Sequence, residues 1–283
     1  IQCFRNTCHK IAPYHQHIVR TQQQIRNYQC PYCIFYMKII YNIPNIIRMA
    51  GMERILAIKA NYLAGLTGME VVIITYEQKN LPLAFDFSDK IRFYDLDIDY
   101  AACRGKNIFW NKIRRIIYTK RHQRRLEEIL LKEKPDITIS MMTGREREWL
   151  YRLKDGSKKI LECHFSYFSY QNVKGIINRY KIKRFLNKIK YYDRLVVLTE
   201  EDRKDWGRKD NIVVIPNALT FYPKESADLS IPRVIAVGRL SAQKGFDRLI
   251  AIWAEIEPYF PDWKLTIIGS GELQDTLERQ IGL

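Results

Sequence analysis

The sequence lacks the signatures of several common functional classes. Residues 1–36 hold no apolar run long enough for the core of a signal peptide or a membrane span, so export is not expected. No Gly-x-Gly-x-x-Gly motif follows the first expected strand, which argues against a dinucleotide-dependent oxidoreductase. Helix-turn-helix, RNA-recognition and zinc-finger patterns are also missing, so we do not expect a nucleic-acid partner.

Acidic residues are scarce relative to basic ones. The 283 residues include 47 Lys and Arg against 31 Asp and Glu, which gives a formal net charge of +16. An excess of this size favours an anionic partner. A hydrophobic content of 47% permits real cores, and the length permits two domains.

Much of the positive charge lies in two stretches, 111–131 and 174–190, where cations alternate with apolar residues at helical spacing. We expect two basic amphipathic helices, which can lie on an anionic membrane surface. The alternative is that the apolar residues are ordinary core faces and the charges are solvated. The cations are Lys112, Arg114, Arg115, Lys120, Arg121, Arg124 and Arg125 in the first stretch, and Lys174, Arg179, Lys181, Lys183, Arg184, Lys188 and Lys190 in the second.

Residues 1–36 differ in composition from the rest of the chain. They hold no acidic residue and four of the six cysteines, including the pair in Cys30-Pro-Tyr-Cys33. We expect a non-native or disordered extension, translated from upstream of the true start. The alternative is a zinc or redox element that uses the Cys-x-x-Cys spacing, which is weak evidence without a second pair. Cys103 and Cys163 fit reduced thiols in a cytoplasmic protein.

From Met37 onward, apolar runs with strand character alternate with helical patterns, which predicts an α/β fold with a parallel sheet. The first unit reads as strand, helix and strand: residues 37–44, a helix opened by Ala50-Gly51, and residues 70–75. Further strands are expected at residues 134–140, 158–164, 193–199 and 211–216. Residues 221–231 lack apolar periodicity and are the best linker candidate.

The most informative stretch is residues 234–247. An apolar run, Val234 to Val237, has the character of a fully buried parallel strand, and Gly238 lets the backbone turn. Arg239 and Lys244 then come near a helix start, where two cations suit a diphosphate. The alternative is that both are solvated cations at the start of a helix.

The pattern of strand, glycine turn and helix recurs in Trp263-Lys-Leu-Thr-Ile-Ile-Gly-Ser-Gly-Glu272. Its glycines are Gly269 and Gly271. Two such turns place glycines at the carboxyl edge of a parallel sheet, where open α/β folds bind ligands.

These two motifs resemble the donor-binding domain of family four retaining glycosyltransferases, which have the GT-B fold. The resemblance implies that Arg239 and Lys244 neutralise the diphosphate of a nucleotide-sugar, UDP- or GDP-linked, with no metal and no other cofactor. The loop at Ala50-Gly-Met-Glu-Arg54 resembles the family's acceptor-side loop that faces the donor phosphates, which implies a donor contact for Gly51. Ala50 replaces the loop's first glycine and would be strained if that position required a positive φ.

His164 is the candidate for chemistry because it follows a strand, at the edge where α/β ligands bind. In the family a histidine at this place lies near the transferred sugar, and the leaving diphosphate is thought to accept the acceptor's proton. An imidazole there would hydrogen-bond a sugar hydroxyl or stabilise developing charge. The alternative is a packed structural histidine. Glu162 is expected to face elsewhere.

The resemblance implies a Rossmann-like acceptor domain over residues 37–220, a linker over 221–231, and the first part of a Rossmann-like donor domain over 232–283. The family's two sugar-gripping glutamates would lie beyond Leu283, so we expect a truncated form with impaired activity. The implied function is transfer to a growing surface saccharide or a lipid-linked acceptor, on the cytoplasmic face of the membrane. The alternative is a basic protein that binds nucleic acid or anionic membrane without catalysis.

Overall fold

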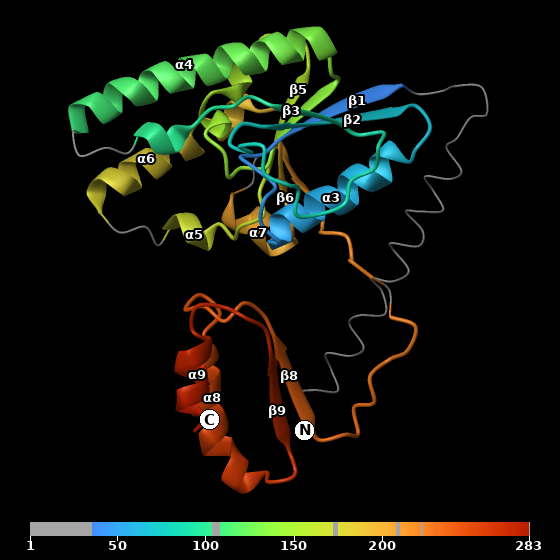
Figure 1. The fold of residues 1–283 in the computed structure, drawn as a ribbon, viewed down its shortest axis with the longest axis vertical. Helices are drawn as coiled ribbons and strands as arrows, with labels where there is room; N and C mark the ends of the chain where they lie inside the picture. The colour runs from blue at the N-terminus through green and yellow to red at the C-terminus, as the bar shows by residue number, and fades with distance from the viewer. Residues whose placement is uncertain (1–35, 104–107, 172–174, 208–209, 222, 283) are drawn as a thin grey trace. The chain divides into compact units, whose positions relative to one another are not determined.

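The computed structural model describes residues 36–103, 108–171, 175–207, 210–221 and 223–282. The chain divides into two compact units, Ile1–Thr220 and Phe221–Leu283. We call them the larger and the smaller unit and describe each by itself (Figure 1). The extension expected at residues 1–36, with its Cys-x-x-Cys motif, lies outside the described residues except for Tyr36.

The larger unit alternates strands and helices along the chain (Figure 1). Its strands are β1 (Met37–Asn42), β2 (Met69–Thr75), β3 (Arg92–Asp95), β4 (Ile137–Ser140), β5 (Lys158–Glu162), β6 (Arg194–Val197) and β7 (Ile212–Val214). Its α-helices are α3 (Gly51–Ala64), α4 (Ile108–Glu133), α5 (Phe168–Gln171), α6 (Ile176–Leu186) and α7 (Glu200–Asp205). Short 3-10 helices are η1 (Tyr100–Cys103), η2 (Glu146–Glu148), η3 (Leu150–Arg152) and η4 (Ile189–Tyr191).

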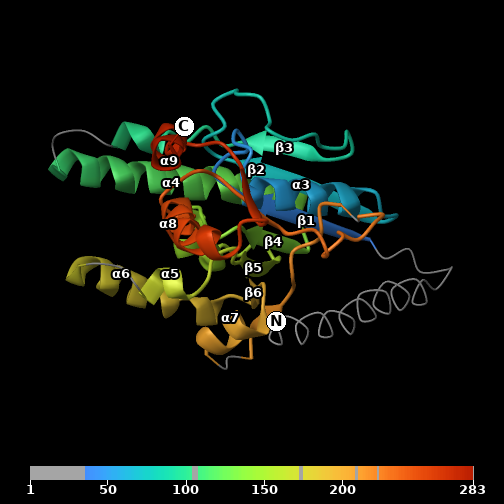
Figure 2. The same cartoon turned by 90° about the horizontal axis from the view of Figure 1, so that it is seen from below.

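These seven strands form one sheet in the order β3-β2-β1-β4-β5-β6-β7. Figure 2 labels the strands from β3 to β6 in this order. Every neighbouring pair is parallel. The order reverses at β1, which pairs with β2 on one side and β4 on the other. In open parallel sheets, ligands bind outside the carboxyl ends of the strands at such a reversal. The crevice beyond β1 and β4 is therefore the expected ligand position in this unit.

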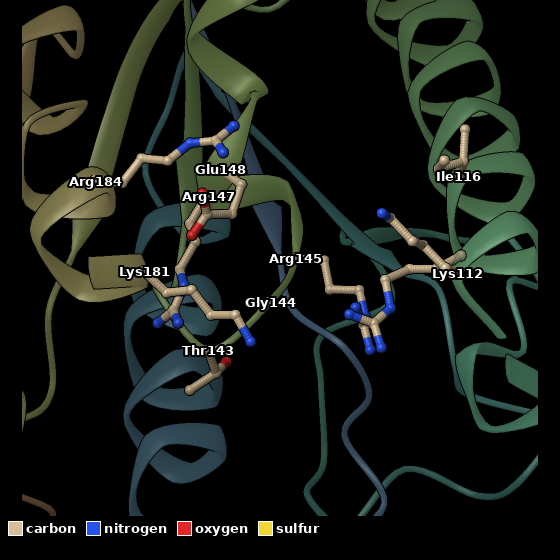
Figure 3. Close-up of a pocket in the computed structure, with 10 residues that line it drawn as sticks. Lys112, Ile116, Thr143, Gly144, Arg145, Arg147, Glu148, Lys181 and Arg184 are labelled. Carbon is tan, nitrogen blue, oxygen red and sulfur yellow. The ribbon is translucent and has the colours of Figure 1, made fainter. Parts of the chain in front are cut away.

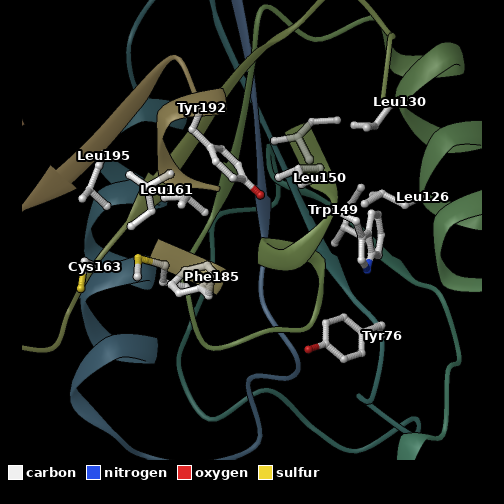
Figure 4. Close-up of a cluster of buried hydrophobic side chains, with 14 of the residues drawn as sticks. Tyr76, Leu126, Leu130, Trp149, Leu150, Leu161, Cys163, Phe185, Tyr192 and Leu195 are labelled. Atoms are coloured by element: carbon white, nitrogen blue, oxygen red, sulfur yellow. The ribbon is translucent and has the colours of Figure 1, made fainter. Parts of the chain in front are cut away.

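Side chains alternate between the two faces of the sheet, and each face has its own core. Along β1, Ile39 and Tyr41 join a cluster that includes residues of α3, whereas Ile40 joins a cluster with residues of α4 and α6. Figure 4 shows part of this second cluster, in which Leu126 from α4 and Phe185 from α6 are both buried. Helices therefore cover both faces, as a doubly wound parallel sheet requires.

A network of four charged side chains joins strands at the amino edge of the sheet. Lys38 lies 3.1 Å from Glu70 and 3.3 Å from Glu133, and Arg92 lies within 2.9 Å of both carboxylates. The Tyr94 hydroxyl also donates to Glu133 at 2.6 Å. Burial opposes ionisation of Glu133, but these partners outweigh it and hold its pKa below the ordinary value. The network ties β1, β2 and β3 to the last residue of α4.

The sequence placed six of the seven strands of this sheet and missed β3. Its Arg92 and Phe93 are exposed, and it pairs only with β2 at the sheet edge. A four-residue edge strand with polar ends carries no apolar run from which it could be predicted. Asp95 is the last residue of this strand.

The smaller unit contains β8 (Arg233–Val237), α8 (Phe246–Ile256), η5 (Glu257–Tyr259), β9 (Lys264–Ile268) and α9 (Gln274–Gln280). The two strands are parallel neighbours, and the buried core consists of Leu240, Phe246, Ile250 and Leu277. The prediction that Val234 to Val237 is fully buried was wrong, because Ile235 and Val237 are 60% and 71% exposed. Alternate residues of β8 face this core, and the described part of the unit leaves the other face open.

The two basic stretches form α4 and the pair α6 and η4. In α4 no side chain described from Phe109 to Arg121 is buried, and Ile116 and Ile117 are both more than half exposed. From His122 to Glu133 the same helix packs into the core. The apolar residues are therefore an ordinary core face only in the second half of α4.

Glu146, at the start of η2, is a fully buried carboxyl. One oxygen accepts a hydrogen bond from the Ser140 hydroxyl at 2.7 Å, and the other has no hydrogen-bond partner among the described residues. Burial raises the pKa of Glu146 to about 7, against the opposing effect of the Ser140 hydrogen bond. The folded larger unit therefore binds a proton at Glu146 that the unfolded chain releases near its ordinary pKa of 4.5.

Replacing Glu146 with Gln will remove this proton linkage. Because the folded-state pKa is raised, wild-type stability falls as pH rises from about 4.5 to 7, by roughly 3 kcal/mol in total. The Gln variant does not lose this stability. The difference between its free energy of unfolding and that of the wild type will therefore shift in favour of the variant from about pH 4.5 to 7 and stay constant above pH 7. Urea unfolding followed by circular dichroism from pH 4.5 to 8 measures the difference. A difference independent of pH would contradict the assignment.

Candidate functional site

The carboxyl edge of the larger sheet carries the loop that joins β1 to α3. The helix begins at Gly51, after Ala50 in an extended conformation with φ −111°. Ala50 therefore occupies the position without the strain that a positive φ would impose. A Cβ on Gly51 would meet nothing within 4 Å, so the backbone here is open to close approach by a ligand.

His164 lies just beyond the end of β5, as predicted, with its side chain only 6% exposed. Its Nε2 is 3.0 Å from Oε1 of Glu162, which also pairs with Lys59 of α3. The expectation that Glu162 faces elsewhere was wrong: residues two apart in a strand share a face. Burial alone would raise the pKa of Glu162, but the contacts with His164 and Lys59 outweigh it and hold the pKa below its ordinary value.

The contacts of His164 are compatible with both interpretations made from the sequence, a ligand-binding residue and a packed structural residue. Its Nε2 is buried and turned to a carboxylate, although the contact does not have the alignment of a good hydrogen bond. A carboxylate beside an imidazole can orient the ring for a ligand, or simply hold it in the core. The geometry places His164 at the ligand edge of the sheet and supplies it with a positioning partner, Glu162.

A cavity of about 940 Å³ opens between α4, the loop after β4, and α6. Figure 3 shows Lys112 of α4 and Lys181 of α6 on opposite sides of the loop that carries Arg145 and Arg147. We call this cavity the basic pocket. Its lining is Lys112, Arg115, Ile116, Thr143, Gly144, Arg145, Arg147, Glu148, Lys181 and Arg184.

In the smaller unit, the turn after β8 holds the two predicted phosphate-binding cations. The Gly238 amide donates to the carbonyl of Ile268 at 3.0 Å, which continues the β8–β9 pairing to the strand ends. Arg239 follows directly, and Lys244 comes two residues before the first residue of α8. Both side chains are exposed, and neither has a carboxylate at ion-pair distance among the described residues.

The glycine turn after β9 packs against the turn after β8. A Cβ on Gly269 would collide with the carbonyl oxygen of Gly238, and a Cβ on Gly271 would lie 2.8 Å from the backbone N and C of Leu240. Both contacts are closer than real Cβ atoms tolerate. Glycine is therefore required at 269 and 271 because two stretches of backbone meet there.

Sequence reasoning missed Lys59, Glu162, Arg145 and Arg147 as residues of the ligand edge. Glu162 could have been found from its two-residue spacing to His164. Lys59 could not have been found, because the helical pattern of α3 does not show which of its cations contacts β5. Arg145 and Arg147 follow a predicted strand end, but their neighbours on α4 and α6 lie some tens of residues away in sequence.

In the part of the chain that the structure describes, no helix has both the length and the apolar character needed to cross a membrane. No set of three His, Cys, Asp or Glu side chains among these residues is placed to share a metal ion. Cys103 and Cys163 are free and buried.

The smaller unit is similar to a known protein family. Residues 222–282 match the family model of glycosyl transferases group 1. A Haemophilus influenzae protein named "uncharacterized glycosyltransferase" is 28% identical over 247 residues, which cover 85% of this chain and 64% of that protein. The amylovoran biosynthesis glycosyltransferase AmsD of Erwinia amylovora is 33% identical over 99 residues, 31% of this chain and 28% of AmsD. The chain spans less than two thirds of either relative.

Solved structures show the same fold at low sequence identity. The crystal structure of TarM matches with a TM-score of 0.62 and 12% identity, over 89% of this chain and 75% of TarM. The pneumococcal O-GlcNAc transferase GtfA, in complex with UDP and GlcNAc, matches with a TM-score of 0.57 and 12% identity, over 87% of this chain and 73% of GtfA.

These matches confirm the glycosyltransferase resemblance and the α/β GT-B fold class predicted from the sequence. They do not favour the alternative of a basic binding protein without catalysis. Membership of family four, retention of configuration and the roles of the site residues stay predictions.

Replacing Gly271 with Ala will destabilise the smaller unit. The new Cβ must displace the Leu240 backbone, and overpacking of this kind costs about 2 kcal/mol. Hydrogen exchange of the β8 and β9 amides will be faster in the variant. Gly51→Ala is the matched control, since its Cβ enters open space and should leave exchange in α3 unchanged. Equal protection in wild type and Gly271→Ala would refute the close approach.

Replacing Glu162 with Gln will destabilise the larger unit at pH 7 by roughly 2–3 kcal/mol, because the charge-assisted hydrogen bond from Lys59 to this buried carboxylate is lost. The folded-state pKa is lowered, so this stability is present above the ordinary pKa and is lost as pH falls through the folded value. Urea unfolding at pH 7 and pH 3 will show the difference shrinking in acid. Glu200→Gln, in an exposed pair with Arg203, is the control with little expected effect.

Proposed function

We propose that this chain, whose residues 222–282 match the family model of group 1 glycosyltransferases, transfers a sugar from a nucleotide-sugar to a saccharide acceptor. The observation that carries the proposal is the corner after β8, where Arg239 and Lys244 are exposed beside two packed glycine turns and no described carboxylate lies at ion-pair distance from either. Cations at the start of a helix suit the diphosphate of such a donor.

The proposed donor is UDP- or GDP-linked. GtfA, which shares the fold, was solved with UDP and GlcNAc, and that supports a uridine nucleotide in a related protein. In our proposal Arg239 and Lys244 neutralise the diphosphate of the donor, so no metal is needed. The turns at Gly238, Gly269 and Gly271 are assigned to the same donor because they stand at the strand ends beside Arg239.

The proposed chemistry is that of family four, with retention of configuration. The bond from the anomeric carbon to the diphosphate breaks, the acceptor hydroxyl bonds to that carbon on the same face, and the leaving diphosphate takes the hydroxyl proton. The main demand on the protein is then stabilisation of charge on the diphosphate, which Arg239 and Lys244 meet. His164, positioned by Glu162, is assigned to a sugar hydroxyl.

The proposed acceptor is a growing surface saccharide, free or lipid-linked. AmsD is named for amylovoran biosynthesis, which supports polysaccharide assembly as the biological setting. The first half of α4, with exposed Ile116 and Ile117 among its cations, is the part of the described chain best suited to rest on anionic lipid. We place the protein in the cytoplasm, peripheral on the inner face of the cell membrane.

Arg239→Ala and Lys244→Ala will each weaken the binding of UDP or GDP to the full chain by about tenfold, as expected for loss of a charge-assisted contact. Isothermal titration calorimetry with both nucleotides measures the affinity and identifies the base. Lys264→Ala is the matched control, because Lys264 is an exposed cation at the start of β9, at the other end of the strand.

Affinity unchanged in both corner variants, or reduced equally by Lys264→Ala, would refute the assignment of the diphosphate to this corner. Such a result would remove the structural observation on which the proposed function is based.

A further inference from the structure

We propose that the basic pocket of the larger unit binds a phosphate group of the acceptor, as a phosphomonoester, a phosphodiester or a diphosphate. The inference rests on the proposed transferase function and names the chemical class of its acceptor. The diphosphate of the donor is assigned to Arg239 and Lys244 in the smaller unit, so the pocket is free for a second anion.

The lining of the pocket is charged almost entirely with one sign. Six of its side chains are cationic, and its single carboxylate, Glu148, is engaged at 2.6 Å by Lys188 from outside the lining. None of the six cations has a carboxylate at ion-pair distance among the residues that the structure describes. This contrasts with the amino edge, where Lys38 and Arg92 are fully matched by Glu70 and Glu133.

Two of the cations are held in place before any ligand arrives. Arg145 lies over the Tyr100 ring with its Cζ 4.3 Å from the centroid. Arg147 donates to the Met142 carbonyl at 2.6 Å and lies over the Phe185 ring at 4.8 Å. A guanidinium has five donors, so these contacts leave others for an oxyanion. Planar, braced guanidinium groups suit phosphate better than a flexible cationic surface does.

The other four cations come from two facing helices. Lys112 and Arg115 belong to α4, and Lys181 and Arg184 belong to α6. Figure 3 shows Lys112 and Lys181 on either side of the Arg145 loop. Like charges converging from three elements repel one another unless an anion lies between them. A multiply charged phosphate ester offsets this repulsion more fully than a single carboxylate.

The position of the pocket agrees with a substrate site. Four residues of its lining, Thr143, Gly144, Arg145 and Arg147, come from the segment after β4, one of the two strands at the reversal of strand order. The Thr143 hydroxyl also contacts Met52 in the first turn of α3, next to Gly51. The pocket thus borders the same crevice as the Gly51 loop. Its volume of about 940 Å³ is in the range of small-molecule sites.

The test is calorimetry of the full chain with inorganic pyrophosphate at low ionic strength, in an Arg239→Ala/Lys244→Ala background that removes the donor corner. Two pocket variants are added to this background: Lys112→Gln/Arg115→Gln and Lys181→Gln/Arg184→Gln. We expect each pocket pair to weaken pyrophosphate binding by about tenfold or more. The control pair Lys120→Gln/Arg124→Gln removes the same charge from α4 outside the lining and should leave binding unchanged.

Three results would overturn the inference. Pyrophosphate binding that survives both pocket pairs would show that the pocket does not hold the anion. Equal loss in the control pair would show a general charge effect of α4. Glucuronate binding as tight as pyrophosphate would show that the pocket does not select phosphate. Circular dichroism of each variant verifies the fold, and UDP binding in the Arg239 and Lys244 wild-type background tests the donor proposal separately.

A second experiment distinguishes whether the phosphate belongs to a lipid or to the saccharide. Sedimentation of the chain with phosphatidylcholine vesicles, with and without phosphatidylglycerol, measures binding to anionic lipid. Vesicle binding that falls in the Lys181→Gln/Arg184→Gln pair, which leaves α4 unchanged, supports a lipid-linked acceptor held by its phosphate. Vesicle binding unaffected by this pair, together with lost pyrophosphate binding, supports a phosphate ester in the saccharide itself.

Discussion

The larger unit depends on the pairing of β1 with both β2 and β4, all parallel. Because the strands run in one direction, every strand end and every following loop is brought to one edge. The reversal of order at β1 opens that edge between two sets of helices. Gly51, Thr143 and His164 come from distant parts of the sequence and meet at this edge only for that reason.

Charge is distributed differently at the two edges. At the amino edge each buried carboxylate has cationic partners, and the network stabilises the sheet. At the carboxyl edge Glu162 satisfies Lys59 and positions His164, but the six cations of the basic pocket stay without carboxylate partners among the described residues. The charges at the amino edge therefore stabilise the fold, and we assign the cations of the basic pocket to ligand binding.

The sequence predicted the elements of this fold well where apolar runs are long and glycines mark turns. It placed β1, β2 and β4 to β9, and it placed the corner at Gly238 to Lys244. It failed where tertiary context decides: β3 is a polar edge strand, Glu162 turns toward His164, and β8 is open on one face. The basic pocket could not be predicted, because it needs α4 and α6 to face each other across a loop.

The attachment of α4 has a mechanical consequence. The 26-residue helix is anchored at its end, where Glu133 joins the amino-edge network and Leu126 and Leu130 enter the core, whereas the described side chains from Phe109 to Arg121 are not buried. The first half is held by fewer contacts, among them Tyr118 beside the core and the Arg114 guanidinium at the Ala102 carbonyl. Lys112 and Arg115 extend from this half, whereas each strand of the sheet is paired with its neighbours. We therefore expect adjustment of α4, rather than of the sheet, to fit the basic pocket to ligands of different size.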